Sequence, residues 1–392
     1  MATLGSGALQ GYAERLSRSL REHTQEAFPP DARKTLRNFS MRETADYLGV
    51  NQNTFRAYIK SYEGRMPTGT LVNGSRRQFS GVEMDEIRQF LWQEGKIDLK
   101  EYRRRQPGEK LQVITMVNLK GGVAKTTLAT SVAQGLGLLG YRVLVVDLDA
   151  QASLTNLFGL TPEADPDMPT VYDVIRFRDP LPMQDVIRKT YFPTIDILPV
   201  SMDVIEFEYE TALSFRDPET VRPFHGRISE ALAQVDGDYD VVLIDSPPQM
   251  SFAVISALFA STGILVPLTA SMLDMMSLST FLSMTSDLMQ IVESQSYEKS
   301  FDFVRFILTR FESTDQPQVQ VASYLRTVLG KSVMGPEFVK STAIGDAANT
   351  AQPIFEVDPR EMNRRTYDRV MESIGRIIED LERDLAASWG RS

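Results

Sequence analysis

The chain has 392 residues, of which 42% are hydrophobic and 24% charged, a composition typical of a folded globular protein and not of a fibrous or disordered one. It contains no cysteine and two histidines, which excludes disulfides, iron–sulfur clusters and cysteine nucleophiles and argues against a histidine metal site. The net charge is −10, but residues 1–110 carry 19 Lys and Arg against 14 Asp and Glu, so this basic front is the candidate for nucleic-acid binding.

The first predicted element is an amphipathic helix within residues 1–30. Apolar side chains recur at a helical spacing over residues 8–27, and Pro29 and Pro30 end the pattern. The apolar stripe would pair with a second copy of the chain or pack on the next domain. The segment lacks the apolar core of a signal peptide, and no run reaches the ~18 apolar residues that span a bilayer. We therefore expect a cytoplasmic protein without a membrane partner.

Residues 39–94 follow the order helix, turn, helix, basic hairpin, helix. Ser40 and Glu43 have the spacing of a capping box, Gly49 marks the turn, and the second helix is expected from Gln52 to Tyr62. This order resembles winged helix-turn-helix DNA-binding domains, especially the MerR-like variety. It predicts such a domain over residues 31–108, and the polar, basic composition of residues 95–110 predicts a linker to the next domain. A small helical dimerisation module with a solvated basic face is the alternative.

The second helix of this unit would be the recognition helix. Phe55 and Ile59 are expected in its core, which leaves polar side chains to enter the major groove. Gln and Asn suit adenine edges, Arg and Lys suit guanine or phosphate, and two arginines of the hairpin would reach the DNA backbone or the minor groove. The predicted DNA-binding residues are Gln52, Asn53, Arg56, Lys60, Arg76 and Arg77.

From Val113 onward, short β-branched runs alternate with helical segments. The predicted strands are at 113–117, 142–146, 240–244, 263–268 and 303–308. Apolar strands separated by helices predict a parallel sheet with helices on both faces. The expected fold class is therefore α/β over residues 109–392, a mostly parallel sheet flanked by helices, preceded by an all-α or winged helix-turn-helix N-terminal domain.

A glycine-rich loop follows the first of these strands and leads directly into a helix. Backbone N–H groups at such a helix N-terminus bind phosphate oxygens, Lys125 fits the cation of the β- and γ-phosphates, and the Thr126 hydroxyl fits a Mg²⁺ ligand. A standard loop has glycine at position 124, and if that position needs a positive φ, alanine costs about 1 kcal/mol or more. The sequence thus predicts a P-loop NTPase that binds ATP and Mg²⁺. The loop residues expected at the nucleotide are Gly121, Gly122, Val123, Ala124, Lys125, Thr126 and Thr127.

Two further strands end in carboxylates. Asp147 and Asp149 follow the strand at 142–146, and Asp245 follows the strand at 240–244, before Ser-Pro-Pro. Ligands of open α/β sheets bind at these carboxyl ends. Asp245 fits the Walker B role, a carboxylate that faces the metal through water.

Together with Lys120, these motifs resemble the deviant Walker A loop, the DxDxQ segment and the DxPP switch of the MinD/ParA superfamily. The resemblance implies an ATP-sandwiched homodimer in which Lys120 reaches the phosphates of the partner. It further implies that Asp147 supports Mg²⁺ and that Asp149 positions the attacking water, although this chain has Ala150 where the family usually has proline. The expected catalytic residues are Lys120, Lys125 and Asp149, and the expected metal-site residues are Thr126, Asp147 and Asp245.

Within that superfamily, the sequence is most similar to large plasmid-partition ATPases with an N-terminal winged helix-turn-helix, including RepA of repABC replicons. The absence of cysteine excludes the nitrogenase iron proteins, and the acid-rich last helix at 366–387 argues against the membrane-cycling division-site ATPases. The resemblance implies a nucleoid-associated partition ATPase with weak basal turnover. A centromere-bound ParB-type partner would stimulate it, and the winged domain would repress its own operon.

The family also implies non-specific DNA binding near the C-terminus in the ATP state. Clustered cations neutralise phosphates and give a salt-dependent affinity. Ordinary helix surface charge is the alternative interpretation. The candidate residues are Lys340, Arg360, Arg364, Arg365 and Arg369.

Two other functions fit part of the sequence. A nucleotide-sensing transcriptional repressor with vestigial ATPase activity is favoured by Ala124 and Ala150. A metabolic P-loop enzyme, such as a dethiobiotin-synthetase-like ligase, fits the loop but has no use for a DNA-binding front.

Overall fold

The computed structural model describes residues 7, 8, 10–12, 14–16, 19, 34–72, 74, 76–215, 223–293, 299–344 and 352–391. It divides the chain into two compact units, Met1–Thr35 and Leu36–Ser392. In the first unit the described residues between 7 and 19 are helical, with Tyr12 and Leu16 exposed. The remainder of the predicted helix at 8–27 lies outside the described residues.

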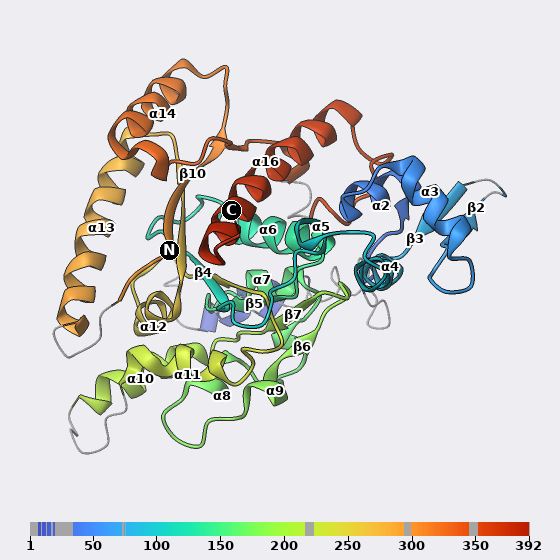
Figure 1. Ribbon diagram of the computed structural model, residues 1–392. Helices are drawn as coiled ribbons and strands as arrows, with labels where there is room; N and C mark the ends of the chain where they lie inside the picture. The colour runs from blue at the N-terminus through green and yellow to red at the C-terminus, as the bar shows by residue number, and fades with distance from the viewer. Residues whose placement is uncertain are drawn as a thin grey trace. The chain divides into compact units, whose positions relative to one another are not determined.

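The N-terminal part of the second unit, residues 36–102, is called the front from here on. It contains two helices joined by a turn, then a hairpin and a third helix (Figure 1). Capping boxes at Ser40/Glu43 and Ser80/Glu83 begin the first and third helices, and Gly49, at φ 70°, ends the first. The predicted element order is present, while DNA binding by this unit stays a prediction. The elements are β1 (Phe39–Ser40), α2 (Met41–Leu48), α3 (Gln52–Ser61), β2 (Thr70–Val72), β3 (Arg76–Phe79), α4 (Gly81–Gln93) and α5 (Leu99–Tyr102).

An eight-stranded sheet forms the centre of the unit, with strand order β11-β10-β9-β4-β8-β5-β7-β6. Every pairing within it is parallel except that of β6 with β7. The predicted α/β class with a mostly parallel sheet is confirmed. The strands are β4 (Gln112–Met116), β5 (Val143–Asp147), β6 (Arg188–Lys189), β7 (Ile195–Leu198), β8 (Val241–Asp245), β9 (Gly263–Thr269), β10 (Phe303–Phe311) and β11 (Phe338–Val339).

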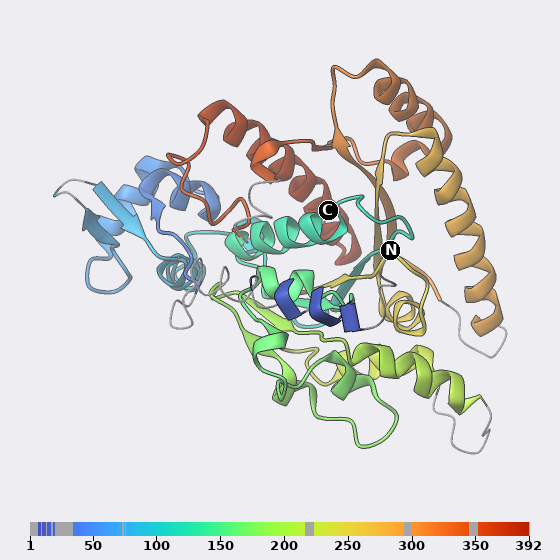
Figure 2. The same cartoon turned by 180° about the vertical axis from the view of Figure 1, so that it is seen from behind.

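Helices cover both faces of this sheet, as the two opposed views show (Figures 1 and 2). Alternate residues of one strand belong to different hydrophobic clusters: Val145 packs with α6 and α16, whereas Val146 packs with α8, α10 and α11. No helix in the described part of the chain is long and apolar enough to cross a bilayer. The helices are α6 (Lys125–Leu139), α7 (Ser153–Leu157), α8 (Val171–Ile175), α9 (Met183–Val186), α10 (Val204–Ser214), α11 (Arg227–Ala233), α12 (Phe252–Ala260), α13 (Met272–Glu293), α14 (Gln316–Leu329) and α16 (Arg364–Ser388).

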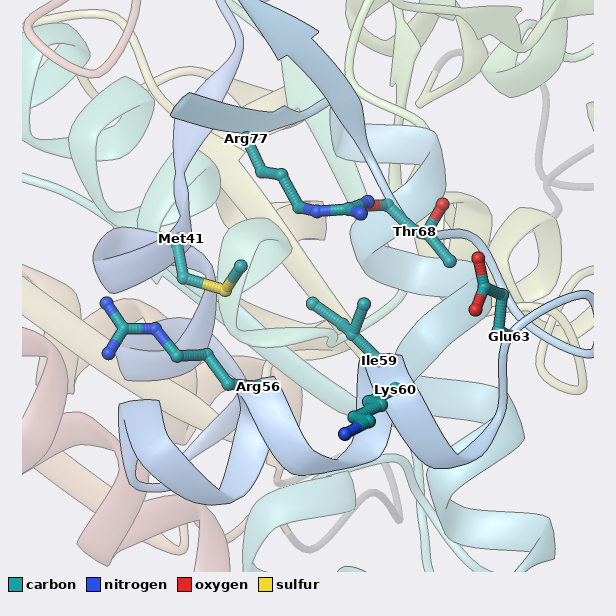
Figure 3. A pocket seen from close by; sticks show the side chains of 7 residues that line it. All are labelled: Met41, Arg56, Ile59, Lys60, Glu63, Thr68 and Arg77. Carbon is teal, nitrogen blue, oxygen red and sulfur yellow. The ribbon is translucent and has the colours of Figure 1, made fainter. Parts of the chain in front are cut away.

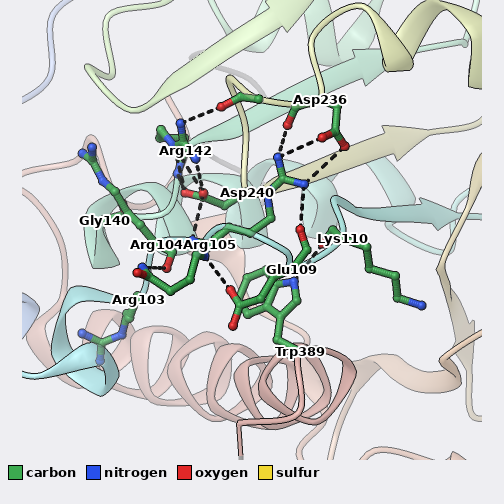
Figure 4. A network of polar contacts seen from close by, with 12 residues as sticks. Arg103, Arg104, Arg105, Glu109, Lys110, Gly140, Arg142, Asp236, Asp240 and Trp389 are labelled. Atoms are coloured by element: carbon green, nitrogen blue, oxygen red, sulfur yellow. Dashed lines mark hydrogen bonds and ion pairs between the residues drawn. The ribbon is translucent and has the colours of Figure 1, made fainter.

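The polar segment at 95–110, interpreted from its composition as a linker, is bound to its surroundings by ion pairs and hydrogen bonds (Figure 4). Arg104 pairs with Asp85 of α4 at 2.5 Å, Glu109 pairs with Arg391 at 2.5 Å, and the backbone N–H of Arg105 donates to Asp240 at 3.0 Å. The ion pairs and hydrogen bonds of residues 95–110 therefore attach the front to the sheet, so this segment is not a free linker.

Candidate nucleotide and nucleic-acid sites

The glycine-rich loop connects β4 to the N-terminus of α6. Lys125 is 7% exposed, and its Nζ donates to the carbonyl oxygens of Asn118 at 3.0 Å and Lys120 at 3.2 Å. Burial lowers the pKa of Lys125, while the nearby Asp245 and Asp149 act in the opposite direction. Ala124 has φ 65° and ψ 32°, so the position that standard loops fill with glycine does require the left-handed conformation.

The end of β10 holds this loop from outside. The Thr309 hydroxyl donates to the Val123 carbonyl at 2.9 Å, and the Arg310 guanidinium donates to the Gly122 carbonyl at 3.0 Å. Arg310 itself has a left-handed φ of 51°, at an irregularity in the pairing of β10 with β11. A strained residue at a ligand-facing edge is typical of functional sites. Their position near the end of an apolar strand could have indicated these two residues, although not their contacts with the loop.

Asp147 and Asp245 lie opposite each other on adjacent strands, and both are fully buried. The Thr155 backbone N–H and hydroxyl donate to one Asp147 oxygen at 2.9 and 2.8 Å, and the Asp149 backbone N–H donates to the other at 3.1 Å. Neither oxygen of Asp245 accepts a hydrogen bond of standard geometry, although the Thr126 side chain lies beside this carboxylate. Burial raises the pKa of Asp147 to about 7, and burial together with Asp147 raises the pKa of Asp245 to about 8.

These carboxylates fit a magnesium site. The two buried oxygens of Asp245 lie next to the Asp147 carboxylate and the Thr126 side chain. They are hard oxygen ligands, and a divalent cation would neutralise the charge of the carboxylates. The described residues contain no cluster of three or more His, Cys, Asp or Glu side chains suited to a metal. The structure thus brings Lys125, Thr126, Asp147 and Asp245 to one edge of the sheet.

Lys120 lies at the mouth of this site and contacts a partner that the sequence did not indicate. Its Nζ donates to Asp274, at the start of α13, and the Asp274 side chain is 1% exposed. The other Asp274 oxygen accepts from the Thr269 backbone N–H and hydroxyl. Lys120 is therefore held within its own chain in this conformation.

The predicted DNA-binding residues of the front lie mostly on its surface. Phe55 and Ile59 are buried as expected, and Asn53, Arg56, Lys60 and Arg76 are exposed, with Gln52 half-buried. Among the described residues, none of the three cations in this set has a carboxylate within ion-pair distance. Arg77 differs, because its guanidinium turns inward and donates to the Thr68 carbonyl at 2.5 Å.

The basic candidates near the C-terminus are largely neutralised by acidic neighbours. Lys340 pairs with Glu312 at 2.7 Å, Arg360 with Asp358 at 2.5 Å, and Arg364 with Asp368 at 2.9 Å. Arg369 donates to the Lys340 carbonyl at 3.1 Å. Arg365 is exposed and has no ion pair within the described ranges. The structure does not gather these residues into one bare basic surface.

Sequence comparisons match residues 111–296 to the family described as AAA domain. A protein of Sinorhizobium fredii named "Putative replication protein A" is 40% identical over 380 residues, covering 96% of this chain and 93% of that protein. The chromosome partitioning protein ParA of Caulobacter vibrioides is 26% identical, covering 71% of this chain and 97% of that protein.

Solved structures share the fold. One called a partition protein matches 96% of this chain and 98% of its own length with a TM-score of 0.64, and at 19% identity it supports the fold alone. A cobyrinic acid a,c-diamide synthase of Mycobacterium smegmatis with bound ADP and magnesium is 27% identical, with a TM-score of 0.50, covering 61% of this chain and 91% of that one.

Proposed function

Because this chain belongs to the family of ParA-type partition ATPases, we propose that it is a DNA-partition ATPase whose grip on DNA depends on its nucleotide state. ATP with Mg²⁺ is its cofactor, and the reaction is hydrolysis to ADP and phosphate, with weak turnover when the protein is alone. The observation that carries the proposal is the buried carboxylate pair, Asp147 and Asp245, beside a P-loop that has Lys120 at its mouth.

Each residue of the site has a task in this reaction. The loop N–H groups and Lys125 bind the β- and γ-phosphates, and Thr126, Asp147 and Asp245 hold the metal directly or through water. Bound Mg²⁺ supplies positive charge to the phosphoryl oxygens. Asp149, at the carboxyl end of β5, orients the attacking water. Little covalent chemistry is required of the protein, because positioning and electrostatic stabilisation account for most of phosphoryl-transfer catalysis.

The switch requires a second copy of the chain. In the ATP state, Lys120 of each protomer leaves Asp274 and contacts the γ-phosphate bound by its partner. A ligand shifts such an equilibrium only by binding the two states unequally, and a γ-phosphate contacted across the interface does so. The resulting homodimer binds non-specific DNA and is nucleoid-associated, and a centromere-bound ParB-type partner stimulates hydrolysis and release.

The front would bind an operator and repress the chain's own operon. Arg56 and Lys60 of α3 and Arg76 of β3 support this role, since none of them forms an ion pair with a described residue and their charges can serve phosphates and bases. The C-terminal cations would contribute less to non-specific binding than their number suggests, because acidic neighbours already pair with Lys340, Arg360 and Arg364.

Steady-state ATP turnover, measured with and without DNA, tests the proposal. Asp149→Ala is expected to keep ATP-dependent DNA binding while turnover falls by about 100-fold or more, the usual scale for loss of a water-positioning group. No turnover by the unmodified chain under any condition would favour the rival function, a nucleotide-sensing repressor with vestigial ATPase activity.

A further inference from the structure

A hollow lies between helix α3 and the hairpin of the front, with a volume of about 250 Å³. We call it the α3–hairpin pocket (Figure 3). Side chains of α3 line one side of it, and Arg77 of β3 extends across the other. The lining residues are Met41, Arg56, Ile59, Lys60, Glu63, Thr68 and Arg77.

The pocket carries an excess of positive charge that the protein does not neutralise. Arg56, Lys60 and Arg77 line it against the single carboxylate of Glu63, and no ion pair joins any of these four side chains to another described residue. This contrasts with the C-terminal basic residues, most of which have acidic partners. Unneutralised cations around a hollow favour an anionic ligand.

The apolar side chains of Met41 and Ile59 also line the pocket, and they strengthen the attraction between its cations and an anionic ligand. Ile59 is 7% exposed, and Met41 is half-buried at the start of α2. Charges beside such a surface interact more strongly than charges surrounded by water. The pocket therefore combines a positive rim with a partly desolvated floor.

Arg77 is fixed in place across this hollow. Arg77 is the strand partner of Leu71 in the hairpin, and the Arg77 guanidinium donates to the Thr68 carbonyl at 2.5 Å. One hydrogen bond uses one of five N–H donors, so several remain for a ligand. A planar, pre-oriented guanidinium suits the oxygen atoms of a phosphate.

We propose that the α3–hairpin pocket receives one phosphate group of the DNA backbone. The proposal rests on the proposed DNA-binding function of the front and refines it. Lys60, Arg77 and Arg56 then fix the register of the protein on the duplex, whereas the sequence pattern had left the α3 cations open between guanine and phosphate. Base reading is left to Gln52, Asn53 and the exposed Arg76. Phosphate contacts position a protein on DNA, and base contacts specify its sequence.

The test is the salt dependence of DNA binding by the full chain, measured with a duplex library whose central bases are randomised. Lys60→Gln is expected to reduce the slope of log K against log salt by about 0.9, the value for one lost phosphate contact, and to leave the selected sequences unchanged. Lys60→Arg should restore the slope. Lys96→Gln, a change at an exposed lysine of the same unit outside the pocket, should leave slope and selected sequences as they were.

Four results would overturn the proposal in distinguishable ways. A changed base preference with an unchanged slope in Lys60→Gln would make Lys60 a base reader. Thermal stabilisation by inorganic phosphate at constant ionic strength, lost in Lys60→Gln while the DNA salt slope of that variant is unchanged, would make a free phosphate the ligand. Absence of DNA binding by the unmodified chain would defeat the DNA-binding function itself, whereas binding with an unchanged slope and preference in Lys60→Gln would defeat the pocket alone.

Discussion

At the scale of single residues, the nucleotide loop contains a backbone conformation that its side chain disfavours. Ala124 has a left-handed φ of 65°, where a Cβ costs roughly 1–2 kcal/mol because it approaches the carbonyl oxygen. The strain lies directly before Lys125, at the start of the helix whose N–H groups are proposed to bind the phosphates. Sequence alone identified the substitution, but the positive φ that gives it a cost came from the structure.

We expect Ala124→Gly to raise the free energy of unfolding by about 0.5–1 kcal/mol. The free energy gained when glycine removes the left-handed strain exceeds the free-energy cost of the extra conformational entropy that glycine gives the unfolded chain, about 0.4–1 kcal/mol. Urea unfolding measures the difference. Ala150→Gly is the matched control, since Ala150 is not among the residues with positive φ and should lose stability. A loss of stability in Ala124→Gly as well would show that position 124 is not strained.

The ion pair of Lys120 with Asp274 makes a second prediction. Lys120→Ala should retain nucleotide affinity and lose ATP-dependent dimerisation, because the lysine is proposed to serve the partner's site. Asp274→Asn keeps the lysine but weakens its attachment within the chain, so dimerisation with ATP should be equal or stronger. Light scattering with nucleotide measures both. Equal loss of the dimer in the two variants would mean that the ion pair itself, and not a free Lys120, supports association.

The sequence located some residues of the site and missed others for a physical reason. The loop and the carboxylates follow strands within a recognisable spacing, and the structure brings them to one edge of the sheet. Asp274, Thr309 and Arg310 contact that loop from positions more than 150 residues farther along the chain. No local pattern encodes such contacts, because the order of strands in the sheet creates them.

At the scale of elements, one buried arginine joins three helices. Arg88 of α4 is 1% exposed and donates to the carbonyls of Tyr47 at 3.1 Å, Leu138 at 2.9 Å and Glu101 at 3.4 Å. These carbonyls belong to α2, α6 and α5, so the guanidinium binds the last turn of the P-loop helix and the front together. Burial, followed by the nearby Arg103, lowers the pKa of Arg88 to about 9, which leaves it protonated at neutral pH.

We expect Arg88→Met to lower the free energy of unfolding by about 1–3 kcal/mol. Methionine fills much of the space, but the buried carbonyls lose their donor, and an unsatisfied buried group costs about that amount. Denaturant unfolding measures the loss. Arg42→Met, at an exposed arginine of α2 with a 3.8 Å ion pair, should change stability by less than about 0.5 kcal/mol. If the two variants lost equal stability, the contacts of Arg88 would have no special importance.

Predicted elements agree with the structure where the apolar pattern was continuous. Strands near 113–117, 142–146, 240–244, 263–268 and 303–308 are present, within a few residues. Strand β7 (Ile195–Leu198) was not predicted, because Asp196 interrupts its apolar run. That carboxylate is accommodated by the Tyr239 hydroxyl and by Lys189, both at 2.7 Å. Tertiary partners therefore override a local polar signal.

At the scale of the whole molecule, the front and the ATPase sheet are less separate than the sequence indicated. Residues Leu36–Ser392 form one compact unit, and one hydrophobic cluster extends from Phe39 and Phe79 of the front to Leu136 of α6. The polar segment between them is held by ion pairs to both sides. The composition showed that the chain changes from basic to acidic. It did not show that the front packs against the sheet, because no local sequence pattern encodes contacts between distant segments.

This continuity gives the proposed switch a physical basis. The helix that begins at the proposed phosphate site ends against Arg88 and the front, so the proposed nucleotide and DNA sites share one packed body. Thermodynamic coupling between two binding sites is reciprocal. DNA should therefore raise the affinity for ATP by the same factor by which ATP raises the affinity for DNA.

The most direct test compares ADP with a non-hydrolysable ATP analogue, each with Mg²⁺, in light scattering and in DNA co-sedimentation of the unmodified full chain. We expect a dimer that coats DNA with the analogue and monomers that release DNA with ADP, because only the γ-phosphate engages Lys120 of both copies. Equal association and equal DNA coating with the two nucleotides would contradict the account.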